Sequence, residues 1–193
     1  MTNMELDLEG ALRGFDPRMR PPMLPDTDVS YTVTDTPVGP LVLAATEAGV
    51  IACSYAGEEE VTARVAGAVS PRVLRSPRRL DPVRRELDEY FEGRRREFTV
   101  PVRPVLAAPF ARTVLESLRQ VPYGSTTTYG GVARAIDQPT ASRAVGNALN
   151  ANPLCILLPC HRVLRSDGSL GGYAGGAIAK QRLLTLEGMA QRA

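Results

Sequence analysis

The sequence predicts a small α/β domain over residues 29–106, followed by a mostly α-helical domain over residues 107–193 that contains a helix-turn-helix. Short β-branched and apolar runs, separated by turn residues, fill the first of these ranges. Apolar residues at helical spacing fill the second. Residues 1–28 are predicted to be a tail because they are rich in proline, although a short helix over about residues 4–13 is a candidate.

In the first domain, three runs indicate a meander of antiparallel strands, with turn residues between them. A helix is expected over residues 80–93, where apolar side chains share one face, and residues 98–102 are a candidate further strand. The basic run over residues 72–79 is interpreted as a solvated linker in preference to a DNA contact. The domain as a whole is interpreted as structural. The three predicted strands are Val29–Thr34, Pro40–Thr46 and Val50–Tyr55.

The second domain begins with a helix that ends near residues 122–124. Thr127 is a candidate N-cap for a second helix that runs to Ile136. Thr140 is the candidate cap of a third helix, from residue 141 to about residue 150. Two short helices joined by a tight turn are typical of a helix-turn-helix, and equally of any helical hairpin in a core.

The predicted third helix has one apolar face and one face of small and polar residues. Small residues let a backbone approach a ligand closely, and an arginine among them suits the minor groove of DNA. The alternative is an ordinary solvated face. The predicted buried stripe is Ala141, Ala144, Val145, Ala148 and Leu149, and the other face carries Ser142, Arg143, Gly146, Asn147 and Asn150.

Composition excludes several classes of protein. The chain has 193 residues, of which 44 % are hydrophobic and 23 % charged, which is ordinary for a globular protein. No apolar run is long enough for a membrane span, and the acidic, proline-rich start does not resemble a secretory signal. Three cysteines form no disulfide framework, so we expect a reducing, cytoplasmic setting.

The charge differs between the two parts of the chain. Residues 1–107 carry 14 Arg and 17 acidic residues, whereas residues 108–193 carry nine basic and four acidic residues. The basic balance of the second part is compatible with a polyanionic partner.

The strongest chemical signal is Pro159-Cys160-His161-Arg162, which follows an apolar run at residues 154–158. His161 is the only histidine, and a base or cation beside a cysteine favours the reactive thiolate. Adjacent side chains of an extended chain point to opposite faces, so a bend or a bridging water is needed for the two to cooperate. The alternative is a buried inert cysteine beside an exposed histidine. Cys53 and Cys155 lie in apolar runs and are interpreted as packing residues.

A glycine-rich loop around Tyr173 follows, over residues 165–176, without the Lys-Ser/Thr ending of a phosphate-binding loop. The last helix is predicted from about residue 177 to Glu187, with Gly188 closing it. A carboxylate in the last turn faces the negative end of the helix dipole. We therefore expect Glu187 to have a cationic partner, and His161 is a candidate.

Several short segments, taken together in their order and spacing, match one family. The match is dense over residues 107–188, weak over residues 29–106, and does not include the tail. The segments are Val121-Pro-Tyr-Gly124, Thr128-Tyr-Gly130, Ala141-Ser-Arg-Ala-Val-Gly146, Asn152-Pro153, Pro159-Cys160-His161-Arg162-Val163, Gly172-Tyr-Ala-Gly-Gly176, Lys180 through Leu184 and Glu187-Gly188. With them, the chain resembles the bacterial type of O6-alkylguanine-DNA alkyltransferases, also called methylated-DNA–protein-cysteine methyltransferases.

The resemblance implies an N-terminal domain with an RNase H-like antiparallel sheet and helix, and a catalytic group in the second domain. Cys160 would accept the alkyl group, and His161, oriented by Glu187, would deprotonate it through a water molecule. Asn152 would brace the turn beside the site. Tyr129 would donate its hydroxyl to N3 of the leaving guanine.

The resemblance also implies DNA contacts and a pocket for the damaged base. Arg143 would enter the base stack in place of the extruded nucleotide. Main-chain groups of Cys160 and Val163 would contact the exocyclic amine of guanine, the N–H of Ala174 would contact O6, and Tyr173 would wall the pocket. The remaining expected DNA contacts are Thr128, Ser142, Gly146, Asn147 and Asn150, and the remaining pocket residues are Leu149 and Cys155.

The function implied is single-turnover repair of O6-alkylguanine in duplex DNA after minor-groove binding and base flipping, with O4-alkylthymine as a further candidate substrate. No cofactor is expected, and no metal, because too few Cys and His residues remain for a zinc site. The expected partner is double-stranded DNA that contains the lesion, and no membrane partner is expected. The protein is expected to be a monomer in the cytoplasm, associated with the nucleoid when it is bound to DNA. Two alternatives are a helix-turn-helix protein that binds lesions without repairing them, which would not need Cys160, and a Cys-His hydrolase, which would need an oxyanion hole.

Overall fold

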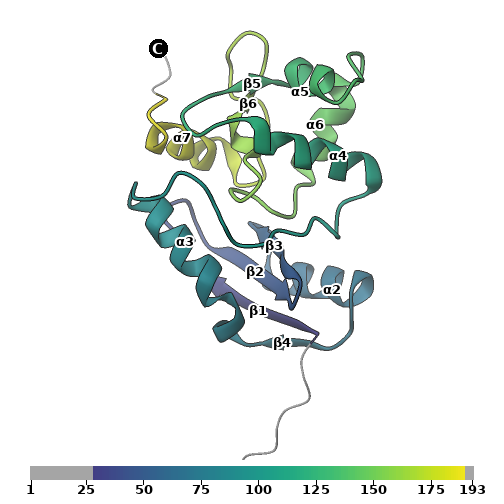
Figure 1. The fold of residues 1–193 in the computed structure, drawn as a ribbon, viewed down its shortest axis with the longest axis vertical. Helices are drawn as coiled ribbons and strands as arrows, with labels where there is room; N and C mark the ends of the chain where they lie inside the picture. The colour runs from purple at the N-terminus through teal and green to yellow at the C-terminus, as the bar shows by residue number, and fades with distance from the viewer. Residues whose placement is uncertain (1–27, 190–193) are drawn as a thin grey trace, which may run out of the picture.

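A four-stranded sheet with two helices forms the first part of the chain, and short helices form the second (Figure 1). The computed structural model describes residues 28–189; the predicted tail and its candidate helix lie almost wholly outside them. The strands are β1 (Val29–Thr34), β2 (Leu41–Thr46), β3 (Gly49–Ser54), β4 (Val73–Arg75), β5 (Thr127–Thr128) and β6 (Val163–Leu164). The helices are α2 (Glu58–Ala68), α3 (Asp81–Phe91), α4 (Pro109–Ser117), α5 (Tyr129–Ala135), α6 (Ser142–Asn150) and α7 (Gly176–Leu186), with 3-10 turns η1 (Pro77–Leu80), η2 (Leu118–Gln120) and η3 (Cys160–Arg162).

The sheet has the strand order β3-β2-β1-β4. The meander β1-β2-β3 is antiparallel, as predicted, but β4 pairs in parallel with β1, so the sheet is mixed. Residues 72–79 are therefore not simply a solvated linker, because they contain β4 and most of η1. A three-residue edge strand with an exposed Leu74 is too short to show a period in the sequence.

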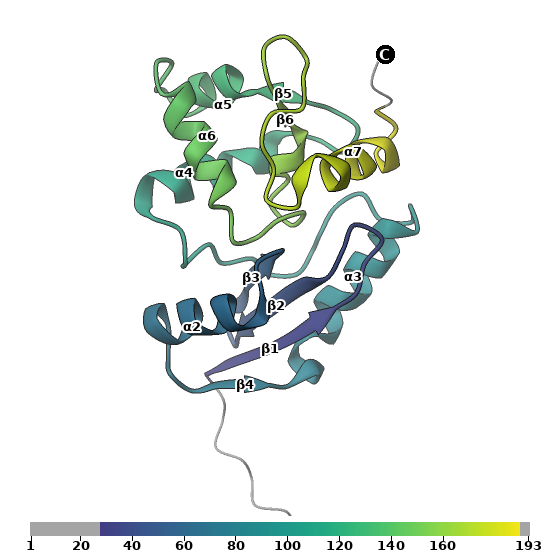
Figure 2. The same cartoon turned by 180° about the vertical axis from the view of Figure 1, so that it is seen from behind.

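Strand β2 is buried on both faces, which places it between two layers of apolar side chains. Val42 and Ala44 pack against Val61 and Val65 of α2, and Leu41, Leu43 and Ala45 join the larger core that includes α3 and the second part of the chain. Figure 2 shows α2 on the opposite face of the sheet from α3. The sequence prediction missed α2 because only two of its eleven residues are buried.

The outer edge of β3 holds two other segments in place of a further strand. The candidate strand at residues 98–102 is wrong: it makes one isolated bridge, Val102 to Val50, and prolines at 101 and 104 interrupt further pairing. A second bridge joins Cys53 of β3 to Leu154, in the segment that leads to Cys160. The edge of the sheet therefore holds both the segment around Val102, which connects the two domains, and the segment from Leu154 that leads to Cys160.

The helices α5 and α6 pack against each other and against α4, but their caps differ from the prediction. Thr128, not Thr127, caps α5, because its Oγ1 accepts a hydrogen bond from the N–H of Gly131 at 3.0 Å while Thr127 pairs with Val163 in the sheet. At α6 the cap position is Ala141, without a side-chain hydrogen bond, rather than Thr140.

The predicted buried stripe of α6 is narrower than expected. Val145, Ala148 and Leu149 are buried, but Ala141 is half-buried and Ala144 is exposed. Successive residues of a helix are rotated by about 100°, which places Ala144 at the margin of the face that meets α4 and α5. A methyl group there is small enough to remain in solvent at little cost.

Gly49 of β3 lies against Pro101, in the segment that connects the two parts of the chain, and substitution of Gly49 tests this contact. The φ of Gly49 is +136°, and a Cβ atom would lie 2.4 Å from the carbonyl oxygen of Pro101. We expect Gly49→Ala to lower the free energy of unfolding by about 3 kcal/mol, from backbone strain and overpacking together. Gly39→Ala is the matched control, because φ is +109° there but nothing lies within 4 Å. Urea unfolding of both variants measures the difference, and equal losses would contradict the contact.

Candidate active site

Two tight turns deliver Cys160 from the buried run Leu154–Leu158. The N–H of Leu157 donates to the carbonyl of Cys155 at 2.8 Å, around Ile156 at φ +71°. The N–H of Cys160 donates to the carbonyl of Leu158 at 2.8 Å, around Pro159 in the geometry of an inverse γ-turn. The chain then enters η3, which supplies the bend that cooperation between Cys160 and its neighbour requires.

Cys160 and His161 are both buried, with exposures of 3 % and 0 %. The alternative of a buried cysteine beside an exposed histidine is therefore wrong. Asn152 braces this turn as follows: its Nδ2 donates to the Cys160 sulfur and to the Leu158 carbonyl, both at 3.1 Å, and its Oδ1 accepts from the N–H of Leu154 at 2.9 Å.

The surroundings of Cys160 favour its thiolate. The thiol of Cys155 donates to the carbonyl oxygen of Asn152 at 3.5 Å. The interaction with Cys155 lowers the pKa of Cys160, burial opposes that effect, and the Asn152 amide and the Lys180 charge lower the pKa further. The net pKa lies below that of an ordinary thiol, which is what a cysteine nucleophile needs.

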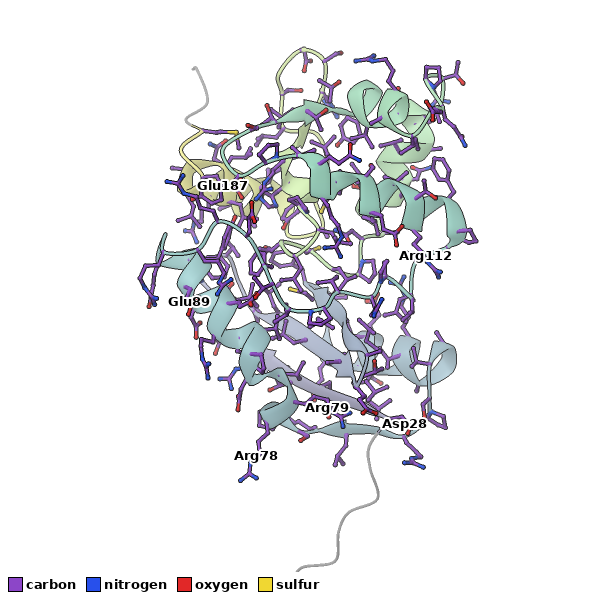
Figure 3. All side chains as sticks on the ribbon, in the orientation of Figure 1. Asp28, Arg78, Arg79, Glu89, Arg112 and Glu187 are labelled. Carbon is purple, nitrogen blue, oxygen red and sulfur yellow. The ribbon has the colours of Figure 1, made fainter. Side chains whose placement is uncertain are left out.

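Glu187 accepts hydrogen bonds from several donors at the end of α7, where it is labelled in Figure 3. His161 Nε2 lies 2.9 Å from Oε1, and Arg162 donates through Nε and Nη2, each at 2.9 Å. The hydroxyl of Tyr90, from α3, donates to Oε1 at 2.7 Å. Burial alone would raise the pKa of Glu187, but the hydrogen bonds from His161, Arg162 and Tyr90 outweigh it and lower the pKa to about 2.

His161 is set up as a neutral base. Burial lowers its pKa more than the bond to Glu187 raises it. Because Glu187 is ionised, Nε2 carries the proton that it donates to the carboxylate. Nδ1 is buried and has no hydrogen-bond partner among residues 28–189. The imidazole therefore has one nitrogen available to accept a proton and a carboxylate positioned to stabilise the resulting cation.

Lys180 is a site residue whose role the sequence analysis did not assign. It is fully buried, and its Nζ donates to the carbonyls of Val163 at 2.6 Å, of Gly172 at 3.4 Å and of Leu170. Burial lowers its pKa to about 8. Lys180 thus ties the glycine-rich loop to β6 beside Cys160. The one feature of the sequence that could have pointed to Lys180 is that it is the only lysine in the chain.

Tyr129 lies under the glycine-rich loop, at the first position of α5. A Cβ atom at Gly171 would lie 2.6 Å from its hydroxyl oxygen, and one at Gly146 would lie 3.8 Å from its ring. The hydroxyl lies so close to the loop backbone that only glycine, which has no Cβ, fits at position 171. Burial raises the pKa of Tyr129, so its hydroxyl remains a proton donor at neutral pH.

The predicted DNA-contact residues share one side of α6 and the start of α5. Arg143, Asn147 and Asn150 are exposed, while Ser142 and Gly146 are half-buried. Arg143 makes no ion pair within the described part of the chain. Thr128 is half-buried and uses its hydroxyl oxygen as the cap of α5.

Most of the predicted pocket residues belong to the same packed cluster as Cys160, namely Leu149, Cys155 and Val163, with Tyr173 packed against it. Cys155, Leu149 and Val163 are buried, Tyr173 is half-buried, and Ala174 is exposed on the loop. The ring of Tyr173 contacts that of His161, with centroids 6.3 Å apart. The carbonyl of Cys160 already accepts from the N–H of Val163, so a base amine would be a second donor there.

The described residues 28–189 contain no group of three or more His, Cys, Asp or Glu side chains placed to hold a metal ion. In the same range, no helix combines the length and apolar character of a membrane span.

Comparison with known proteins decides the family. Residues 29–104 match the ribonuclease-like domain, and residues 109–189 the DNA-binding domain, of the 6-O-methylguanine DNA methyltransferases. A methylated-DNA–protein-cysteine methyltransferase of Methanosarcina acetivorans is 37 % identical over 159 residues, 82 % of this chain and 97 % of its own length. This chain belongs to the methylated-DNA–protein-cysteine methyltransferase family.

Solved structures of the family agree. A Mycobacterium tuberculosis O6-methylguanine methyltransferase has 33 % identity and a TM-score of 0.70, covering 86 % of this chain and 96 % of its own. The same species' OGT in complex with DNA has 33 % identity and a TM-score of 0.69, covering 82 % and 92 %. The predicted family, its ribonuclease-like first domain and its helical second domain are therefore confirmed, and DNA repair by alkyl transfer to a cysteine is the function of this family.

The charge of Glu187 gives a pH test in this methyltransferase. A carboxyl whose pKa falls from 4.5 to about 2 on folding stabilises the protein above pH 4.5 and loses that effect as pH falls towards 2. Glu187→Gln leaves Arg162 without its counter-charge, so we expect a loss of about 3 kcal/mol of unfolding free energy at neutral pH.

The difference between wild type and Glu187→Gln should shrink as the pH falls through this range, as measured by urea unfolding. Glu116→Gln, at an exposed position on α4, is the control and should change little at any pH. A Glu187→Gln difference that does not depend on pH would contradict the assignment of charge.

Proposed function

We propose that this methyltransferase repairs O6-alkylguanine in double-stranded DNA by transferring the alkyl group to Cys160, once per chain. The observation that carries the proposal is the setting of the Cys160 thiol. The thiol is buried, it accepts a hydrogen bond from Asn152, and its pKa is lowered. It adjoins a neutral His161 that is bonded to the Glu187 carboxylate. A nucleophile, a base and a group that orients the base are the parts that covalent catalysis by cysteine requires.

In the proposed reaction, Nδ1 of His161 takes the thiol proton through one water molecule, and Glu187 stabilises the imidazolium. The sulfur attacks the alkyl carbon in line with the bond to O6. A carbon–sulfur bond forms, the carbon–oxygen bond breaks, and its electron pair passes to the guanine. Tyr129 donates a hydrogen bond to N3 of the guanine anion that leaves. That anion takes up a proton from water, and the His161 imidazolium returns to water the proton that it took from the thiol. The products are guanine and a thioether at Cys160, a stable bond that ends the activity of the chain.

Access to the stacked base requires extrusion of the nucleotide, at a cost of a few kcal/mol. We propose that α6 lies in the minor groove, with Arg143 in the vacated stack and small residues such as Gly146 against the backbone. The flipped base would then contact the main chain at Cys160, Val163 and Ala174, with Tyr173 as the wall. The protein would act on DNA as a cytoplasmic monomer.

The first test is the intact mass of the protein after incubation with a duplex that carries one O6-methylguanine. We expect a gain of one methylene equivalent, about 14 Da, mapped to Cys160 and saturating at one per chain. Cys160→Ser should show no gain. Binding of the duplex without a mass gain in the wild type would favour a protein that recognises lesions without repairing them, and continued turnover would favour a hydrolase.

The second test separates base flipping from chemistry. Arg143→Ala should slow methyl transfer from duplex DNA by about tenfold or more, because removing a stacked contact costs about 1–3 kcal/mol. Transfer from free O6-methylguanine, which needs no flipping, should change less than about twofold. The control is Arg112→Ala, which also removes an exposed arginine but from α4 (Figure 3). Equal losses on both substrates would contradict the role of Arg143.

A further inference from the structure

The strand β3 supports the active site through its outer edge. The N–H of Cys53 donates to the carbonyl of Pro153 at 2.7 Å, and the N–H of Cys155 donates to the carbonyl of Cys53 at 2.8 Å. The reactive segment is therefore hydrogen-bonded to the first domain only five residues before Cys160. Tyr55 follows β3 directly, so its position is set by the same edge.

Tyr55 contacts the glycine-rich loop of the second domain at two points. The hydroxyl of Tyr173 donates to the Tyr55 hydroxyl at 3.4 Å, and the rings meet edge to face with centroids 5.6 Å apart. A Cβ atom at Gly175 would lie 2.6 Å from Cζ of Tyr55, so the loop backbone rests on the Tyr55 ring. These contacts span 118 residues of sequence.

The ring of Tyr173 contacts two other rings edge to face. It meets the His161 ring at 79° and the Tyr55 ring at 73°. Close-packed side chains move only when neighbours leave room. Because Glu187 holds His161, a shift of Tyr173 requires Tyr55 to yield its contact.

We propose that Tyr55 is a positioning residue that fixes Tyr173 as the wall of the alkyl pocket and so restricts transfer to small O6-alkyl groups. This inference rests on the proposed function and adds the class of substrate: methyl and other short alkyl groups, in preference to benzyl. The ring of Tyr55 carries the effect, because it is the ring that contacts both the Tyr173 ring and the backbone at Gly175. The hydroxyl contributes one longer hydrogen bond.

The test compares Tyr55→Ala and Tyr55→Phe with the wild type in single-turnover transfer from duplexes carrying O6-methylguanine or O6-benzylguanine. We expect Tyr55→Ala to raise the benzyl-to-methyl ratio of rates by about tenfold or more, the scale on which pocket size discriminates substrates. Tyr55→Phe keeps the ring and should keep the ratio within about twofold. A merely structural role would slow both substrates alike, so an unchanged ratio in Tyr55→Ala would overturn the inference.

A second experiment tests the contact between Tyr55 and Gly175 without measuring which alkyl groups are transferred. Gly175 has φ −83°, which alanine adopts without strain, and the three atoms nearest to an added Cβ all belong to the Tyr55 ring. We expect Gly175→Ala to lower the melting temperature in the wild-type background and to have little effect beside Tyr55→Ala, where the added methyl group fills vacated space. Equal effects in both backgrounds would overturn the contact. Absence of methyl transfer by the wild type would instead contradict the proposed function, and the melting result would still stand.

Discussion

The buried carboxylate of Glu187 needs hydrogen-bond donors, because an unpaired charge out of contact with water is very costly. It obtains them from η3, through His161 and Arg162, and from α3, through Tyr90. The N–H of Gly124 adds a longer bond at 3.3 Å. Segments that are far apart in the sequence must therefore converge on one side chain at the end of α7. Once they do, the position of η3 is fixed, and with it the position of Cys160.

The consequence for the chemistry lies in how η3 divides its side chains. His161 and Arg162 point to Glu187, while Cys160 points to Asn152 and Cys155. A 3-10 turn separates consecutive side chains by about 120°, so neighbours in sequence serve different environments. The carboxylate side is strongly charged and locks the imidazole. The thiol side is apolar apart from a few donors. Those donors favour the thiolate against the opposing effect of burial.

The sequence was sufficient for the parts of the fold that follow local patterns. The meander of β1 to β3 and the helices α3, α4 and α6 have clear periods, and Gly188 marks the end of α7. The Cys160–His161 pair stands out by its residue types. The sequence was not sufficient where contacts cross the chain. Tyr90 meets Glu187 across 97 residues, and no local pattern marks it as a donor to that carboxylate. Ile156 at φ +71° is a second example, because a β-branched residue is disfavoured there and only the tertiary structure holds it.

The first domain was interpreted as structural, and its contacts give it a more direct part in the site. Its sheet edge holds the reactive segment through Cys53, and Tyr90 of its helix α3 donates to Glu187. Tyr55 meets the glycine-rich loop. Each of these contacts reaches a different component of the proposed site: the segment of the nucleophile, the group that orients the base, and the pocket wall. A sheet is stiffer than the loops it touches, because its strands are tied by ladders of hydrogen bonds and buried on two faces. In the proposed mechanism, the second domain therefore supplies the reacting groups, and the contacts of the first domain fix the distances between them.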